Sequence, residues 1–350
     1  SFVFLFALLA LFAGLSQAAQ SFAGSNLYYA AGLTYDQQKT LFSKLQEAGV
    51  KVLRVWLDGQ SGSPKGTQIN GFSGLETNGP AQWNGDEVLN RLDDVMYNAH
   101  QYGIKLLISI HSYNILESHG DFYGKWYGTG SFYTDNNAIN YFKQRIAHVM
   151  AHVNPHNGKP WSQCSEYIFA FEAQNEAMNG DANFLREHGP TWQCTMASAI
   201  RSNLGGKKDI LITTGGGGWL DVSLLDGYFN CGDLDILAIH AYGTGDYDTN
   251  KLASYVSKAQ QYGKKLIMQE WGACYYNNAN ERCGPPTQVG VLSESTRSNN
   301  IKQWASQISK AGIPWMYWQV LPNKDPHQDW DYEVGVQENI WSSLSQAMNS

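Results

Sequence analysis

The sequence carries little charge and has no cluster of basic residues. Only 16% of its 350 residues are charged, and 31 acidic residues outnumber 24 basic ones, which gives a net charge of −7. Proteins that bind nucleic acids carry basic patches or stripes, so we expect no polynucleotide partner. With 43% hydrophobic residues, a chain of this length can bury one large core or the cores of two ordinary domains.

Motifs for metals and nucleotide cofactors are missing as well. The sequence has no Cys-x-x-Cys pair and no His-Glu-x-x-His, and no Gly-x-Gly-x-x-Gly follows the first expected strand. The run Gly215 to Gly218 lacks the Lys-Ser/Thr of a phosphate-binding loop, so we interpret it as a flexible strand-to-helix connection. His148 and His152 stand four apart on an expected helix, but no acidic partner is placed with them. We interpret them as solvated surface histidines and expect neither a metal nor a cofactor.

Long apolar runs are absent except at the N-terminus, where "SFVFLFALLALFAGLSQAAQ" is apolar from Phe2 to Leu15. A membrane-spanning helix needs about 20 apolar residues. We therefore interpret residues 1–18 as a truncated secretory signal that ends in the small residues Ser16-Gln17-Ala18. Residues 19–350 are then expected to form a secreted, extracellular, soluble monomer.

Five cysteines suit an oxidising compartment. Cys274 and Cys283 flank a short polar loop and are the first candidate disulfide. Cys164 with Cys194 is the second candidate, and Cys231 is then left over. No Asn-x-Ser/Thr sequon occurs, so any glycosylation is expected to be O-linked.

One local pattern recurs along the chain, in "LQEAGVKVLRVW", "AHQYGIKLLISI", "AQQYGKKLIMQE" and "ISKAGIPWMYWQ". In each case the end of a helix is followed by a glycine and then by an apolar strand. The glycines at 49, 103, 263 and 312 stand where a helix end favours a left-handed residue. Continuous apolar strands after helices are typical of parallel sheets that are covered on both faces. Thr34 and Gln37 predict a capping box at the start of the first helix.

Eight strands are expected once the gaps between these repeats are filled, and amphipathic helices alternate with them. The strand ranges are 23–28, 52–56, 105–110, 167–172, 209–213, 235–239, 265–269 and 314–318. This pattern predicts an α/β fold, a single-domain (β/α)8 TIM barrel. A doubly wound open sheet is the alternative, but it usually has a glycine-rich phosphate turn after its first strand. No linker or shift in composition divides the chain.

Polar residues follow the apolar strands, at the ends that a barrel gathers on one face. In "YIFAFEAQNEAMNG" the apolar run is followed by Gln174, Asn175 and Glu176, and in "KLIMQEWGACYY" it is followed by Gln269 and Glu270. Over the whole chain the candidate site residues are Arg54, His111, Asn175, Glu176, His240, Tyr242, Glu270 and Trp318.

Each candidate also has a purely structural interpretation. Arg54 can form an ion pair with Asp58 or Asp94, the two histidines can belong to the core, and Trp318 can fill the barrel. Two glutamates at strand ends, together with these companions, are hard to explain as packing. We therefore expect an active site at this face.

The set resembles the signature of glycoside hydrolase family 5, whose retaining (β/α)8 enzymes include cellulases and mannanases. That family has Asn-Glu at the end of strand four, a Glu at the end of strand seven, and an Arg, two His, a Tyr and a Trp around them. All eight occur here in order, and the resemblance covers essentially the whole of residues 19–350. One departure is Ala177, which stands where the family has a proline and is expected to alter the loop alone.

The resemblance implies a retaining mechanism with two carboxyl groups about 5 Å apart. Glu270 is then the nucleophile, and Glu176 is the general acid and later the base. The resemblance also implies that Arg54 and Tyr242 hold Glu270 and that His240 lies beside Glu176.

Contacts with a sugar are implied in the same way. Asn175 is expected to bind the 2-hydroxyl, and His111 and Trp318 to line the sugar site. Aromatic and amide side chains in the expected loops are further candidates: Trp83, Tyr113, Trp126, Tyr127, Tyr133, Trp219, Tyr275, Tyr276, Trp330, Gln60, Asn70, Asn114 and Gln319.

The stretches "GSNLYYAAG" and "KVLRVWLDGQ" resemble the family's mannanases more than its cellulases, so we expect an endo-β-1,4-mannanase. An endo-β-1,4-glucanase and an exo-acting β-glycosidase are the alternatives within the family. A carbohydrate-binding protein on an inactive barrel is the non-enzymatic alternative, but such proteins usually lack a catalytic carboxylate and both are present here. The expected partner is a β-mannan or β-glucan, and no membrane is expected to take part.

Overall fold

The computed structural model of this protein describes residues 22–277, 283 and 290–350. The expected secretory signal, residues 1–18, lies outside the described residues. Among the residues that are described, no helix combines the length and the apolar character needed to cross a membrane.

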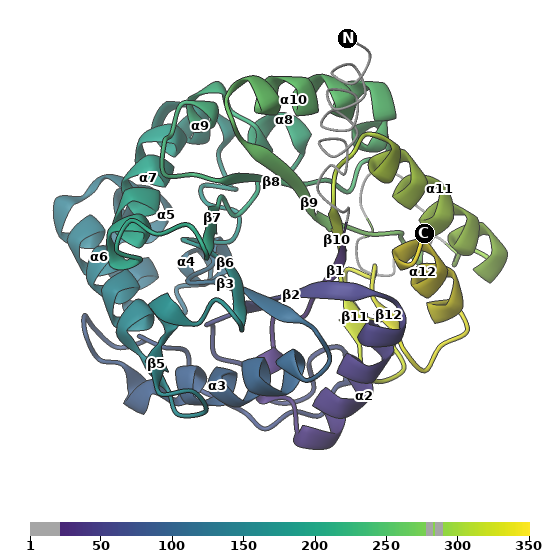
Figure 1. The fold of residues 1–350 in the computed structure, drawn as a ribbon, viewed down its shortest axis with the longest axis horizontal. Helices are drawn as coiled ribbons and strands as arrows, with labels where there is room; N and C mark the ends of the chain where they lie inside the picture. The colour runs from purple at the N-terminus through teal and green to yellow at the C-terminus, as the bar shows by residue number, and fades with distance from the viewer. Residues whose placement is uncertain (1–21, 278–282, 284–289) are drawn as a thin grey trace, which may run out of the picture.

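Eight parallel strands close into a barrel at the centre of the molecule (Figure 1). They are β1 (Ala23–Asn26), β2 (Val50–Trp56), β3 (Lys105–Ser109), β6 (Ile168–Glu172), β7 (Leu211–Thr213), β8 (Ile236–His240), β9 (Lys265–Trp271) and β10 (Trp315–Tyr317). Each strand pairs with the next in this order, and β10 closes the ring by pairing with β1. All eight predicted strands are present with slightly different ends, and the (β/α)8 fold is confirmed.

Helices form a ring around the barrel (Figure 1). They are α2 (Tyr35–Glu47), α3 (Glu87–His100), α4 (Tyr113–Glu117), α5 (Phe122–Thr134), α6 (Asn136–Ala151), α7 (Ala182–Asn203), α8 (Leu220–Ser223), α9 (Asp226–Phe229), α10 (Thr249–Gln261), α11 (Glu294–Lys310) and α12 (Trp341–Met348). Short 3-10 turns occur at Ala30–Gly32, Pro64–Gly66, Asn84–Asp86, Trp161–Gln163 and Thr244–Tyr247. Two small strand pairs lie outside the barrel, β4 (Val153–Asn154) with β5 (Lys159–Pro160) and β11 (Val320–Leu321) with β12 (Val334–Gly335).

Local signals in the sequence explain where several helices begin and end. The Thr34 hydroxyl accepts a hydrogen bond from the backbone of Gln37, and the Gln37 side chain accepts one from the backbone of Thr34, which confirms the capping box. The glycines at 49, 103, 263 and 312 all have positive φ, as predicted for residues that end helices before strands.

Side chains of each strand point alternately into the barrel and out toward the helices, and those that point inward form two layers. Val52, Ala170, Ala238 and Ile267 come from four different strands and belong to one small buried apolar cluster. The residues between and beside them, such as Leu53, pack outward in the larger core under the helices. Because strand side chains repeat every two residues, the next inward positions are 54, 172, 240 and 269. A polar layer of Arg, Glu, His and Gln therefore lies on the apolar layer, at the carboxyl ends of the strands.

One disulfide prediction is confirmed and the other is wrong. Cys274 and Cys283 are bonded. Cys194 is bonded to Cys231 instead of Cys164, because α7 carries it to the side where Cys231 follows α9, with Cα atoms 5.6 Å apart. Cys164 is buried and forms no disulfide.

His148 and His152 were expected to be solvated surface histidines, but each has an aspartate partner. His148 Nε2 lies 2.7 Å from Asp86 Oδ1, and His152 Nε2 lies 2.7 Å from Asp93 Oδ2. Both aspartates are distant in the sequence, since Asp86 directly precedes α3 and Asp93 lies in the middle of it, so the spacing of the histidines alone does not reveal them.

Candidate active site

Arg54, on β2, is the centre of the polar layer. Its buried guanidinium donates to Glu172 Oε1 through Nε (2.9 Å) and Nη2 (2.6 Å), and to Glu270 Oε1 through Nη1 (2.7 Å). It also donates to the side-chain oxygens of Asn175 (2.7 Å) and Asn26 (3.1 Å). Burial alone lowers the pKa of Arg54, but the two carboxylates raise it above its ordinary value. Arg54 is therefore a fixed cation that two acids share, and neither aspartate considered from the sequence is its partner.

Glu270, on β9, has a hydrogen-bond donor at each oxygen. Oε1 accepts from Arg54, and Oε2 accepts from the Tyr242 hydroxyl at 2.7 Å. Burial, followed by the charge of Glu270, raises the pKa of Tyr242 well above its ordinary value, so the phenol keeps its hydrogen. These two charge-assisted hydrogen bonds fix the carboxylate in place and stabilise its negative charge.

Glu176 follows β6 and faces Glu270 across the barrel mouth. Its Oε1 lies 2.8 Å from His240 Nδ1, and the same nitrogen lies 3.5 Å from Glu270 Oε2. One oxygen of each glutamate and this nitrogen all lie within 4.8 Å of one another. The side chain of Glu176 is 16% exposed, against 6% for Glu270. The two acids therefore have different surroundings, an imidazole for one and a cation with a phenol for the other.

The glycine run that follows β7 is needed for close packing. A Cβ on Gly215 would lie 1.7 Å from the Gln174 carbonyl oxygen, and one on Gly216 would lie 2.2 Å from a ring carbon of His240. The Gly215 carbonyl also accepts a hydrogen bond from the backbone of Glu176, a residue with φ of 47°. The run thus holds the acidic loop and the histidine together, which differs from the flexible connection expected from the sequence.

His111 lies deeper than expected. Its ring is buried, with Nε2 2.7 Å from Asp121 Oδ2 and Nδ1 3.0 Å from Gln174 Nε2, and it stacks on Phe132. Both ring nitrogens therefore have protein partners, so neither is left to bond a ligand. Its carbonyl accepts a hydrogen bond from the backbone of Asn175 at 2.8 Å. His111 supports the Asn-Glu segment from below.

Two members of the polar layer were not nominated from the sequence, Glu172 and Gln269. Glu172 Oε2 accepts from Gln269 Nε2 at 2.7 Å, and Gln269 Oε1 lies 2.6 Å from His240 Nε2. Each follows an inward apolar residue, Ala170 or Ile267, by two positions. Counting by two along each strand was the signal that would have found them.

Trp318, which follows β10, belongs to an aromatic group beside the carboxylates. Its ring is parallel to Tyr28 with centroids 6.0 Å apart, and its centroid lies 5.7 Å from that of Trp56. On the other side, Tyr332 packs on Tyr242 with centroids 4.6 Å apart. Trp318 is half-buried within this aromatic group.

The loop aromatics divide into packed and exposed ones. Tyr133 is buried, and its hydroxyl donates a hydrogen bond to Gln174. Trp83 stacks on His148, which belongs to helix α6 of the outer ring. Of the aromatic residues that were candidates from the sequence, Trp126, Trp219 and Trp330 are exposed.

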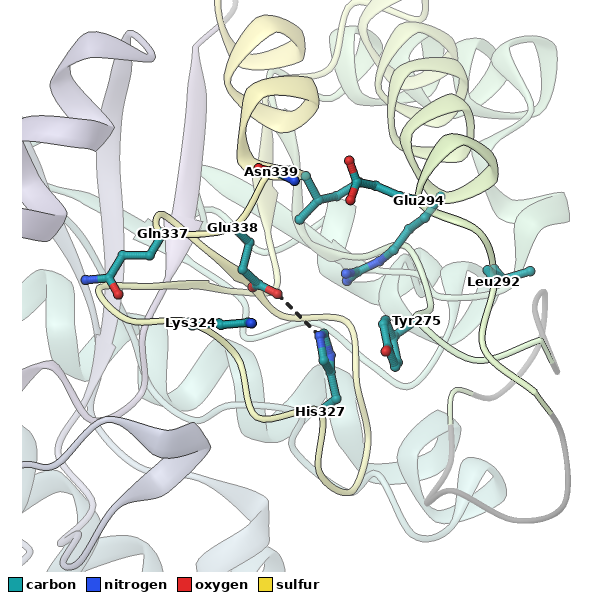
Figure 2. Close-up of a pocket in the computed structure, with 10 residues that line it drawn as sticks. Tyr275, Leu292, Glu294, Lys324, His327, Gln337, Glu338 and Asn339 are labelled. Atoms are coloured by element: carbon teal, nitrogen blue, oxygen red, sulfur yellow. Dashed lines mark ion pairs between the residues drawn. The ribbon is translucent and has the colours of Figure 1, made fainter.

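A separate group of charges lies in the segment after β10, beside a pocket of about 410 Å³. Figure 2 shows His327 directed toward Glu338, with Tyr275 beside it. His327 Nδ1 lies 2.8 Å from Asp331 Oδ2 and 3.3 Å from Asp325 Oδ2. Burial alone lowers the pKa of His327, but these carboxylates raise it to about 12. His327 is therefore an imidazolium that joins three acids.

Two groups within the described ranges bring three possible metal ligands within 4.8 Å of one another: Glu176, His240 and Glu270, and Asp325, His327 and Asp331. In the first, both oxygens of Glu270 already accept hydrogen bonds from Arg54 and Tyr242. In the second, the protonated His327 presents hydrogens to the carboxylates. Hydrogen bonds therefore account for both arrangements.

Glu333, next to this second group, makes stability depend on pH. Its carboxyl is buried 3.2 Å from Lys65 Nζ. Burial raises the pKa of Glu333 to about 7, which Lys65 opposes and Asp325 and Asp331 reinforce. The folded state therefore holds this proton more tightly than the unfolded state does, so the contribution to stability is present below the ordinary glutamate pKa and is lost as pH rises through 7. We expect a loss on the order of 3 kcal/mol in the free energy of unfolding.

Urea unfolding between pH 5 and 8 measures this effect. Glu333→Gln should lower the pH dependence by about that amount, because the amide does not ionise. Glu117→Gln, at an exposed position, is the matched control and should keep the wild-type dependence. Equal pH dependence in Glu333→Gln and wild type would contradict the prediction.

Comparison with known families gives one match over most of the chain. The family description "Cellulase (glycosyl hydrolase family 5)" matches residues 15–324. Among curated sequences, the probable mannan endo-1,4-beta-mannosidase A of Aspergillus flavus is 26% identical over 314 residues, which are 84% of this chain and 78% of that protein. The mannan endo-1,4-beta-mannosidase A of Aspergillus aculeatus is 27% identical over 278 residues, which are 72% of this chain and 69% of that protein.

Solved structures share the fold at low sequence identity. The endo-1,4-beta-mannanase from Rhizomucor miehei superposes with a TM-score of 0.70 at 19% identity, covering 94% of each chain. A broad-specificity endoglucanase from Clostridium acetobutylicum gives a TM-score of 0.57 at 16% identity, covering 94% of this chain and 97% of that one. The barrel alone thus does not separate mannan-cleaving from glucan-cleaving proteins.

Proposed function

Because this chain belongs to glycosyl hydrolase family 5, we propose that it cleaves a β-linked polysaccharide with retention of anomeric configuration, as an endo-β-1,4-mannanase. The observation that carries the proposal is the approach of Glu176 and Glu270, which have oxygens within 4.8 Å of each other. Retaining enzymes keep their two carboxyl groups about 5 Å apart, whereas inverting enzymes need about 6.5–9.5 Å to admit a water molecule. The short spacing favours a covalent intermediate.

In the proposed reaction, Glu270 attacks the anomeric carbon and forms a bond to it as the glycosidic C–O bond breaks. Glu176 gives its proton to the departing oxygen. Water then enters, loses a proton to Glu176 and attacks the anomeric carbon, which releases Glu270 as a carboxylate. Arg54 and Tyr242 stabilise the negative charge on Glu270 before attack and after release.

Neighbouring groups supply the proposed sugar contacts. The Asn175 side-chain oxygen accepts from Arg54, and its amide nitrogen donates one hydrogen to Ser112 Oγ at 3.4 Å. The second amide hydrogen is left for the sugar 2-hydroxyl. Trp318 offers a stacking surface. Secretion also belongs to the proposal: residues 1–18 serve as the signal, and the two disulfides suit an oxidising compartment.

The choice of mannan is supported by the names of the sequence relatives, which are mannan endo-1,4-beta-mannosidases. We expect β-1,4-mannan or glucomannan to yield reducing oligosaccharides about tenfold faster or more than carboxymethylcellulose, a difference of about 1.4 kcal/mol in transition-state binding. A reducing-end assay on matched polymer masses measures this ratio, and chromatography of early products measures their size.

Each other outcome has a definite meaning. Equal or faster cleavage of carboxymethylcellulose would contradict the proposed mannanase activity and favour an endoglucanase. Release of monosaccharide alone would replace endo by exo action. Binding of both polymers with no new reducing ends would contradict catalysis itself.

A further inference from the structure

The two glutamines that precede the paired glutamates each contact a histidine. Gln174 bonds to His111, and Gln269 bonds to His240, which is the neighbour of Glu176. Gln269 is fully buried and has a partner at both ends of its amide, Glu172 at 2.7 Å and His240 Nε2 at 2.6 Å. This amide therefore links a buried acid to the histidine of the active site.

Hydrogen-bond chemistry fixes the direction of this link. Glu172 forms a fully buried ion pair with the Arg54 cation at 2.6 Å, so it faces Gln269 as a carboxylate that can only accept. The end of Gln269 that faces Glu172 must then be its amino group, and the end that faces His240 must be its carbonyl oxygen. A carbonyl can only accept, so His240 Nε2 must carry a hydrogen.

We propose that Gln269, oriented by Glu172, is a positioning residue that fixes the tautomer of His240 and directs its unprotonated Nδ1 toward Glu176. The inference rests on the proposed function, because it assigns His240 as the proton partner of the general acid. Neither Gln269 nor Glu172 needs to touch the substrate for this purpose.

The tautomer decides which form of Glu176 the histidine stabilises. With the hydrogen on Nε2, neutral His240 presents a lone pair at 2.8 Å, so it accepts a hydrogen bond from the protonated acid. In the other tautomer Nδ1–H would donate to the carboxylate and favour the ionised form, which cannot protonate a leaving group. When His240 takes up a proton, that proton must enter at Nδ1. Burial opposes this step, but Glu270 and Glu176 raise the pKa of His240 above its ordinary value.

Nuclear magnetic resonance of ¹⁵N-histidine-labelled protein tests the tautomer directly. At a pH where the ring is neutral, we expect a protonated-type Nε2 and an unprotonated-type Nδ1 signal from His240, assigned by loss of the signals in His240→Gln. This measurement needs no catalytic activity. A proton on Nδ1 in the wild type would overturn the inference.

A pair of matched variants tests the consequence. Gln269→Met keeps the length of the side chain and removes the carbonyl, so Nδ1–H should appear, and the basic limb of the kcat/KM profile should move down by about one pH unit, a tenfold change in ionisation. Gln174→Met removes an equally buried amide from His111 and should leave the His240 signals as in the wild type.

The two hypotheses fail in different ways. Wild type that hydrolyses no β-glycan would contradict the proposed function while the Nε2–H tautomer is still observed. Active wild type, with Gln269→Met showing the same tautomer and the same basic limb, would contradict the positioning role alone.

Discussion

Replacing Glu270 by alanine is expected to abolish turnover of every substrate, polymeric or activated, by on the order of 10⁴ to 10⁶-fold. Glu270 is the proposed nucleophile, and no other carboxylate can take its place: Glu172 is held behind Arg54, and Glu176 lies on the opposite side of the mouth. Without an attacking group, a good leaving group does not help. Hydrolysis of an aryl β-mannoside and of mannan, measured side by side, checks the prediction.

The fold should survive this replacement, which makes the result interpretable. Arg54 keeps its two hydrogen bonds to Glu172 when Glu270 is removed, so the buried cation is not left without a partner. Glu270→Gln is the isosteric control and should be equally inactive. Activity within tenfold of wild type on the aryl substrate, with unchanged circular dichroism, would remove Glu270 from the role of nucleophile.

The barrel was predictable because its signals are local and repeated. A glycine between the end of a helix and an apolar run is a short-range feature that recurs four times in the chain. Together with the remaining apolar runs it gives eight strands that alternate with helices, which restricts the topology to very few choices. The chemistry at the strand ends was predictable for the same reason, since parallel strands bring their carboxyl ends to one face. Arg54, Tyr242 and His240 thus have the partners that were expected for them.

What the sequence did not reveal depends on partners that are distant along the chain. Cys194 faces Cys231 only because of how α7 and α9 pack, and no spacing rule distinguishes that pairing from the one with Cys164. His111 has the residue type and strand position of a substrate ligand, yet Asp121 and Gln174 occupy both of its nitrogens. His111 is buried, and the residues next to it in the sequence do not indicate whether a single histidine is buried.

Glu172 is a different case, because its signal was present in the sequence. A charged residue inside the apolar run "YIFAFEA" is costly unless it is paired, and it stands two residues beyond the inward Ala170. Its partner, Arg54, breaks "VLRVW" in the same way. Two opposite charges at equivalent heights of two barrel strands predict a buried pair, and the 2.6 Å contact is that pair.

Replacing Glu176 by alanine is expected to separate natural from activated substrates. Mannan cleavage should fall by about 10² to 10⁴-fold, because the sugar leaving group needs a proton. An aryl mannoside with an acidic phenol leaves without that proton, so its first step should be nearly unaffected. The second step then lacks a base, and added azide, which needs none, should speed turnover and yield a β-mannosyl azide. Glu176→Gln is the size-matched control and should behave in the same way.

The stereochemistry of this rescue is the sharpest test of the paired glutamates. In the proposed reaction, carboxyl groups with oxygens within 4.8 Å of each other leave no room for an attacking water beside Glu270, so the sugar is transferred to Glu270 first. Two displacements restore the starting configuration, and the first-formed reducing sugar from wild type should be the β-anomer, as read by proton NMR before mutarotation. An α-anomeric first product, or an α-azide from Glu176→Ala, would mean a single displacement, and both carboxylate roles would then be wrong together.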